Sequence, residues 1–132
     1  MEKLKKIEEL LEGAKTYYLA TVEGAQPRVR PYGAYVVYDD KLYIMAFYHT
    51  NATKQIEHNP KAEICALHGL TLRIECKLVE DNRQEVKDAL LNKMPVLKPI
   101  LGEKAEQAVM YQVTDAKASF YKMMELVESY EF

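Results

Sequence analysis

The fold is decided by one stretch of sequence, Tyr17-Tyr18-Leu19-Ala20-Thr21-Val22-Glu23-Gly24-Ala25-Gln26-Pro27-Arg28-Val29-Arg30-Pro31-Tyr32-Gly33-Ala34. Its first part is rich in aromatic and β-branched residues, and Glu23-Gly24-Ala25-Gln26 then supplies a turn, so the stretch predicts a β-hairpin. A second turn is predicted at Asp39-Asp40. The predicted strands are Thr16–Val22, Arg28–Tyr38 and Lys41–Phe47. Three consecutive strands joined by tight turns predict an antiparallel meander.

Outward from this stretch, further short strands alternate with short helices. In Thr71–Val79 apolar and polar residues alternate, which predicts a sheet with one solvated face. Helices are expected over Glu2–Glu12, over Thr50–Pro60 and from Asp81 or Asn82 to about Leu91, and further strands over Lys61–Leu67, Thr71–Val79, Val109–Val113 and Ala116–Tyr121. The last two strands read as a hairpin around Thr114-Asp115, and residues 93–108 carry no decisive pattern.

Many antiparallel strands with few residues between them favour a closed or nearly closed barrel, because closure removes exposed sheet edges. The predicted fold class is therefore mainly β with short helices (α+β), an antiparallel split β-barrel. The 132 residues are expected to form a single domain, 1–132, large enough for one hydrophobic core.

Composition excludes several classes of partner. Lys and Arg total 18 against 20 Asp and Glu, and the net charge of -2 provides no long-range attraction to nucleic acid or an anionic membrane. The longest apolar run, Leu42–Tyr48, is too short to cross a bilayer as a helix, and the charged N-terminus does not resemble a signal peptide. Cys65 and Cys76 lie in apolar strand patterns, so we expect buried, reduced thiols in a cytoplasmic protein.

No set of side chains predicts catalysis by the protein alone. The sequence has no nucleophile elbow and no Gly-rich phosphate loop, and its three histidines, His49, His58 and His68, are far apart in the chain. We therefore expect no metal site and no catalytic residue.

The residues that do predict binding lie between Arg28 and Lys54. Arg28, Arg30 and Tyr32 project from one face of a strand, and two guanidinium groups this close repel each other unless they are solvated or share an anion. Downstream, the first turn of a helix carries four polar residues whose side chains and backbone N–H groups suit a phosphate monoester: Thr50, Asn51, Thr53 and Lys54. A solvated basic strand and an ordinary helix cap remain the alternatives.

The order and spacing of several motifs resemble the pyridoxamine 5′-phosphate oxidase-like, FMN-binding split-barrel family, and most closely its small bacterial members related to nitroimidazole-resistance reductases. The resemblance rests on Tyr17–Gly24, Gln26–Ala34, Lys41–Tyr43, Thr53–Ile56 with Asn59-Pro60, Leu72–Glu75, Ala116–Tyr121 and Tyr130–Phe132.

This resemblance implies flavin mononucleotide (FMN) as cofactor and assigns its binding residues. Arg30, Pro31, Tyr32 and Gly33 correspond to the strand beside the isoalloxazine ring, with an Arg near the phosphate or the ring edge. Phe47, Tyr48, His49 and Thr50 correspond to the segment that lines the flavin, and Thr53 and Lys54 to the residues that hold its phosphate.

The resemblance also implies a homodimer with the flavin sites at its interface. A barrel face carrying Tyr32, Tyr35, Phe47 and Tyr48 would otherwise expose a large apolar patch, which again favours a dimer. The acidic C-terminus, Glu125–Phe132, speaks against a phosphorylated B6 substrate.

The expected function is therefore that of an FMN-dependent oxidoreductase with a small-molecule electron donor and acceptor. A non-enzymatic flavin carrier or redox sensor is the first alternative. A relative that binds haem or a deazaflavin is the second, because relatives of this fold bind both.

Overall fold

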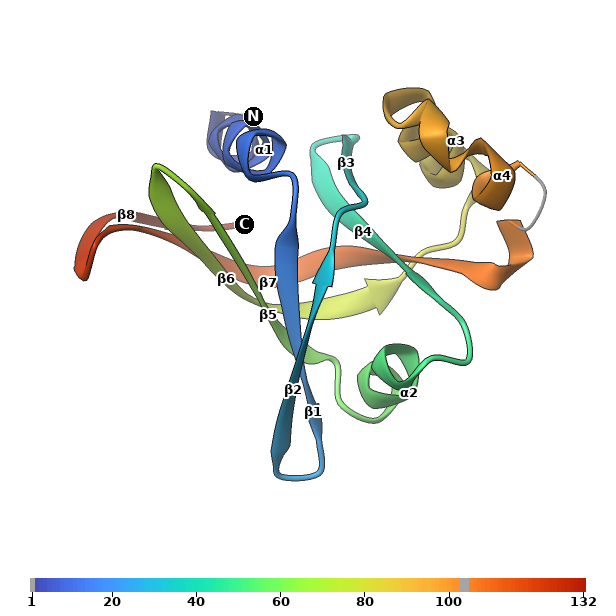
Figure 1. Ribbon diagram of the computed structural model, residues 1–132, viewed down its shortest axis with the longest axis horizontal. Coiled ribbons are helices and arrows are strands. Elements are labelled where there is room, and N and C mark those ends of the chain that lie inside the picture. Colours follow the sequence, from blue (N-terminus) through green and yellow to red (C-terminus); the bar gives the residue numbers. More distant parts are fainter. Residues whose placement is uncertain (1, 103–104) are drawn as a thin grey trace.

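A computed structural model describes residues 2–102 and 105–132 of the chain. Its strands form one eight-stranded antiparallel sheet in the order β2-β1-β5-β6-β7-β4-β3, with β8 paired to β7 (Figure 1). The strands are β1 Tyr17–Glu23, β2 Gln26–Tyr32, β3 Tyr35–Tyr38, β4 Lys41–Phe47, β5 Lys61–His68, β6 Leu70–Glu80, β7 Ala108–Lys122 and β8 Glu125–Glu131. The mainly antiparallel β prediction is confirmed.

Short helices connect or cover these strands. They are α1 Glu2–Ala14, α2 Asn51–His58, α3 Gln84–Lys93 and α4 Lys98–Leu101, with 3-10 turns at Pro95–Leu97 and Ala105–Gln107. The three helices expected from sequence are present, although α3 begins after Arg83 rather than at Asp81 or Asn82. In the part of the chain that the structure describes, no helix is long and apolar enough to span a membrane.

The predicted return strand Arg28–Tyr38 is wrong as a single strand, and so is the three-stranded meander. The strand is interrupted at Gly33-Ala34, between β2 and β3. There the carbonyl of Ala34 accepts a hydrogen bond from the Tyr17 hydroxyl at 2.8 Å. Before the break β2 pairs with β1, and after it β3 pairs with β4, at the opposite end of the strand order. Two small residues at this position therefore separate the strands that pair at the two ends of the sheet order.

The predicted C-terminal hairpin around Thr114-Asp115 is also wrong. β7 runs through these residues as one strand, and a bulge absorbs an extra residue, since Glu75 pairs with Lys117 but Lys77 pairs with Thr114. Asp115 takes a φ of 45° there. Polar residues at a bulge resemble a turn in sequence, because both interrupt the apolar pattern. The true hairpin joins β7 to β8, a strand that the sequence did not predict.

The main core lies between α1 and the inner face of the sheet. On β6 the predicted inward residues are all buried: Leu72, Ile74, Cys76 and Leu78. Cys65 corrects one expectation, because it is only half-buried and lies on the outer face, between the inward-facing Ile64 and Ala66. A second core packs α3 and α4 against β3, β4 and β7.

Candidate functional site

The candidate site lies where α2 packs beside the β1–β2 hairpin (Figure 1). The helix begins where the sequence predicted. Thr50 is its N-cap, and the Thr50 hydroxyl accepts from the Thr53 backbone N–H at 3.4 Å and donates to the Phe47 carbonyl at 2.8 Å. Thr53 is 1% exposed, and its hydroxyl donates to the Thr50 carbonyl at 3.0 Å. Both threonines therefore hold the turn that leads from β4 into α2.

Arg30 is the residue that joins the hairpin to this helix. Its Nη2 donates to the Gln55 side-chain oxygen at 2.8 Å, and its Nη1 donates to the Thr21 hydroxyl at 2.8 Å and the Leu19 carbonyl at 3.2 Å. The Thr21 hydroxyl in turn donates to Gln55 at 2.5 Å. Thr21 and Gln55 are both buried, at 1% and 6% exposure, and Arg30 is half-buried.

All hydrogen-bond partners of Arg30 are neutral oxygens. Among the residues that the structure describes, neither Arg30 nor Lys54 forms an ion pair with a carboxylate. A cation that is partly removed from water is costly unless an anion accompanies it. The Arg30–Thr21–Gln55 cluster is therefore a positively charged, partly buried group whose hydrogen-bond partners among the described residues are all neutral.

A hollow of about 480 Å³ lies beside this cluster, between the hairpin tip and α2. Its lining includes Lys54 and Gln55 from the helix and Val22 and Glu23 from the hairpin. Lys54 is exposed, so its ammonium group is available to a ligand.

Arg28 lies on the same strand face as Arg30 but has a different partner. Its guanidinium donates to the Glu23 carboxylate from Nε at 3.0 Å and from Nη2 at 2.7 Å, and both side chains are about half exposed. The Glu23 carboxylate supplies a counter-charge for Arg28, in contrast to Arg30.

Aromatic residues of the predicted site lie at the ends of β2 and β4. The rings of Tyr32 and Tyr17 meet edge to face with centroids 6.2 Å apart, and Tyr32 is half-buried. Phe47 is 36% exposed at the end of β4. Pro31 points to the opposite face of β2, because neighbouring strand residues alternate, and Gly33 lies in the break before β3.

The next two residues after β4 are held in a specific conformation. The Tyr48 hydroxyl donates to Glu80, and the Asn82 side-chain amide donates to both Tyr48 at 2.7 Å and Glu80 at 2.6 Å. Burial, with the Glu80 carboxylate next, raises the pKa of Tyr48. His49 takes the left-handed conformation with φ 66°, which is uncommon for a residue other than glycine.

The sequence missed four residues that organise this site: Thr21, Gln55, Glu80 and Asn82. Their partners depend on the strand register and on how α2 docks. One corrected expectation concerns the dimer, because Tyr35 is 3% exposed within the core and does not contribute to an exposed apolar patch.

Comparisons with known proteins identify the fold independently. The family described as pyridoxamine 5′-phosphate oxidase matches residues 4–117. A NimC/NimA family protein from Clostridium acetobutylicum is 32% identical with a TM-score of 0.89, and the alignment covers 98% of this chain and 94% of that one. No match was found among curated proteins.

Two more distant structures share the fold. A FAD-binding protein from Mesorhizobium loti is 15% identical with a TM-score of 0.66, over 86% of this chain and 91% of that one. HutZ, the haem storage protein of Vibrio cholerae, is 14% identical with a TM-score of 0.68, over 95% of this chain and 93% of that one. Because the family match spans most of its length, the chain belongs to the pyridoxamine 5′-phosphate oxidase-like split-barrel family.

Proposed function

We propose that this protein binds FMN and acts as an FMN-dependent oxidoreductase on a small molecule. The observation that carries the proposal is Arg30, a half-buried guanidinium group whose partners are all neutral. A phosphate monoester would supply the missing negative charge, and guanidinium groups bind phosphate oxygens through charge-assisted hydrogen bonds.

The surrounding residues fit the rest of an FMN molecule. Lys54 offers a second cation beside the hollow near α2. Tyr32, Phe47 and Tyr48 offer aromatic surface of the kind that packs against a flat ring system. When bound, FMN supplies the redox chemistry, and the protein's residues bind it, orient it and limit its contact with water. The acidic strand β8 does not favour a phosphorylated B6 substrate.

A second copy of the chain would complete each flavin pocket in this proposal. Support comes from β2, one face of which is exposed along its length, with Val29 68% exposed and Pro27 also exposed. A strand that carries the candidate binding residues on one face and is uncovered on the other is a natural surface for a partner.

The absorption spectrum of the purified, cofactor-loaded protein tests the cofactor. FMN gives a band at about 450 nm, whereas haem gives an intense Soret band, and both are properties of the cofactor. A flavin band that follows the protein through gel filtration supports the proposal. A Soret band would instead assign this chain the chemistry that its HutZ-like fold suggests.

Turnover separates an enzyme from a carrier. We expect NADH or NADPH to reduce the bound flavin in a stopped-flow experiment, and a nitro compound or quinone to reoxidise it through many cycles. Flavin that binds tightly but is reduced by neither nucleotide would favour the carrier or redox-sensor alternative.

A further inference from the structure

The β1–β2 hairpin arranges the candidate binding residues in a row that leads to its tip. The register pairs Arg30 with Leu19, and Arg28 with Thr21, which lies nearer the turn. Because every second residue of a strand points to the same face, Tyr32, Arg30 and Arg28 follow one another at intervals of about 7 Å. The candidate ring surface, the candidate phosphate cation and a second cation therefore succeed each other along one face.

The hollow between the hairpin tip and α2 continues this row beyond Arg30. Lys54 and Gln55 border the hollow, which measures about 480 Å³, and the Gln55 side-chain oxygen accepts a hydrogen bond from Arg30. Glu23 borders the same hollow at the hairpin tip. A ligand that places its rings at Tyr32 and its phosphate at Arg30 would therefore direct into this hollow whatever is attached to that phosphate.

FMN and flavin adenine dinucleotide (FAD) differ at this point of the ligand. In FMN the phosphate ends the molecule, whereas in FAD a bridging oxygen joins it to a second phosphate, which carries adenosine. The second phosphate of FAD would lie one step further along the row, beside Arg28 and Glu23. The charges of these two residues therefore bear on the choice between the two flavins.

The Glu23 carboxylate holds the guanidinium group of Arg28. The Nε and Nη2 atoms of Arg28 both donate to Oε1 of Glu23, at 3.0 Å and 2.7 Å. Within the described part of the chain, the other carboxylate oxygen of Glu23 accepts no hydrogen bond. A phosphate at this position would meet a neutralised cation and a carboxylate, which cannot donate a hydrogen bond to it and which repels its charge.

We propose that Glu23 makes this site select FMN over FAD, by holding Arg28 and by placing a negative charge where the second phosphate of FAD would lie. The proposal rests on the FMN site of the proposed function and adds a residue that determines its specificity. An unfavourable contact with the competing ligand is a common source of specificity. FMN avoids this contact because it ends at its single phosphate.

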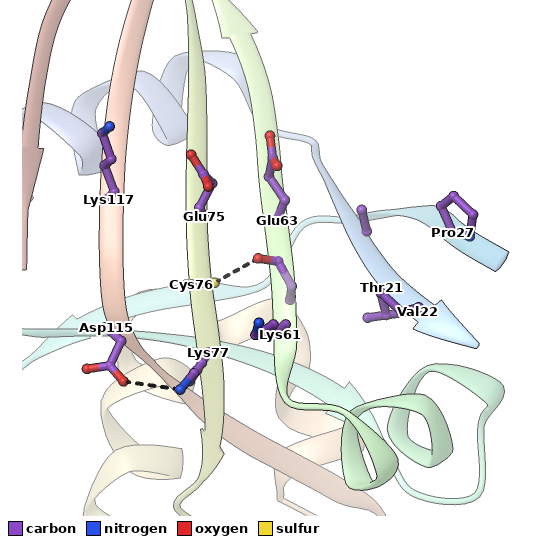
Figure 2. A pocket seen from close by; sticks show the side chains of 12 residues that line it. Thr21, Val22, Pro27, Lys61, Glu63, Glu75, Cys76, Lys77, Asp115 and Lys117 are labelled. Carbon is purple, nitrogen blue, oxygen red and sulfur yellow. Dashed lines mark hydrogen bonds and ion pairs between the residues drawn. The ribbon is translucent and has the colours of Figure 1, made fainter. Parts of the chain in front are cut away.

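A second hollow, of about 510 Å³, borders the other face of the hairpin and the outer face of β5 and β6 (Figure 2). Val22 and Pro27 line it, and they are opposed in the register. Both alternate with the residues of the row, so they lie on the face opposite Arg28 and Arg30. Lys61 of β5 also lines this second hollow and provides a control cation outside the proposed path.

Isothermal titration of the cofactor-free protein with FMN and with FAD tests the proposal. The wild type should bind FMN at least about 10-fold more tightly than FAD. Glu23→Gln keeps the size of the side chain and removes its charge, so it should tighten FAD binding about 10-fold and change FMN binding less than about twofold. In Glu23→Gln/Arg28→Met this gain should disappear, because the released guanidinium group is what binds the second phosphate.

Lys61→Gln is the matched control, because it also removes one charge beside the hairpin but in the second hollow. Both flavin affinities should be unchanged in this variant. Thermal melting establishes that each cofactor-free variant is folded. The Glu23 and Arg28 side chains are about half exposed, so the loss of their ion pair should cost little stability.

The possible failures are distinct. A wild type that does not bind FMN would overturn the proposed function itself. If FMN binds, then equal affinities for FMN and FAD, or equal changes of both in Glu23→Gln, would overturn selection by Glu23 and leave the FMN site in place. A loss of FAD affinity alone in Lys61→Gln would place the second phosphate in the other hollow and would overturn the proposal as well.

Discussion

At the scale of single residues, the site depends on a cation whose partners are all neutral. Arg30 binds Thr21 and Gln55, and these two side chains also bind each other. The cluster therefore retains a hydrogen bond if the guanidinium group is removed. A cation whose partners are all neutral adds little to the stability of the ligand-free protein, because the cost of removing it from water offsets the gain from its hydrogen bonds.

We predict that Arg30→Met weakens FMN binding at least about 10-fold, the loss of one charge-assisted hydrogen bond. The free energy of unfolding of the ligand-free variant should lie within about 1 kcal/mol of the wild-type value, because an apolar side chain of similar length replaces a poorly compensated charge. Fluorescence titration with FMN and urea denaturation give the two quantities.

Arg28→Met is the matched control, because Arg28 lies on the same face of β2 but has the Glu23 carboxylate as its partner. FMN affinity should be nearly unchanged in this variant. Equal losses of affinity in both variants would show that the strand's overall charge, rather than Arg30, attracts the flavin.

This site was only partly predictable from sequence. Arg30 stood out because it shares one strand face with Arg28, and Lys54 because a cation in the first turn of a helix suggests an anion. Thr21 and Gln55 did not, because one lies within a strand pattern and the other within a helix. Only the register of β1 with β2 and the docking of α2 bring their polar atoms to Arg30.

The buried thiol of Cys76 makes the stability of the protein depend on pH. Burial raises the pKa of Cys76 from 9.0 to about 12. Below pH 9 the thiol is protonated in both folded and unfolded states, so it causes no pH dependence. Between pH 9 and about 12 only the unfolded state ionises, and stability falls by up to about 1.4 kcal/mol per pH unit.

We therefore predict that wild type loses stability faster than Cys76→Ala over this alkaline range. Urea denaturation of both proteins at several pH values gives the difference between their free energies of unfolding. The buried tyrosines are the same in both proteins, so their ionisation cancels in this difference. Parallel curves above pH 9 would mean that the Cys76 thiol ionises as readily in the folded state.

At the scale of elements, the turns largely decide how the strands pair. Asp39 and Asp40 connect β3 to β4 with φ values of 53° and 58°. Positive φ at both central residues is the requirement of a type I′ turn, which favours Gly at the second position. The sequence predicted this turn, although its two aspartates are not the most favourable pair.

We predict that Asp40→Gly stabilises the protein by about 0.5 kcal/mol, because glycine adopts this φ without a steric penalty. Asp40→Ala should instead destabilise it by roughly 1 kcal/mol, since alanine also has a Cβ but lacks the local hydrogen bonding of aspartate. Thermal melting compares the three proteins. A higher melting temperature for Asp40→Ala than for wild type would contradict the assigned turn.

Element boundaries that depend on distant partners were the part of the fold that the sequence left open. No charged residue interrupts the segment from Pro31 to Tyr38, and only pairing with different neighbours reveals the break between β2 and β3 at Gly33-Ala34. The bulge at Asp115 likewise exists only in relation to β6. By contrast, the α2 cap and the alternation in β6 are local patterns, and both predictions are confirmed.

At the scale of the whole molecule, FMN binding should be linked to folding. A ligand that binds only the folded state stabilises it by RT ln(1 + [L]/Kd), about 2.7 kcal/mol at 100 times Kd. We predict a rise in melting temperature with FMN concentration that follows this relation. A melting temperature unaffected by saturating FMN would contradict binding to the native barrel.

The most direct test of the central claim compares FMN with riboflavin, which lacks the phosphate, on wild type and Lys54→Ala. Lys54 is exposed beside the hollow and has no ion pair in the described chain, so its removal should leave the fold intact. Titration by flavin fluorescence should show FMN binding weakened roughly ten- to hundredfold in the variant, with riboflavin binding unchanged. Equal FMN affinity in the two proteins would contradict a phosphate site at α2.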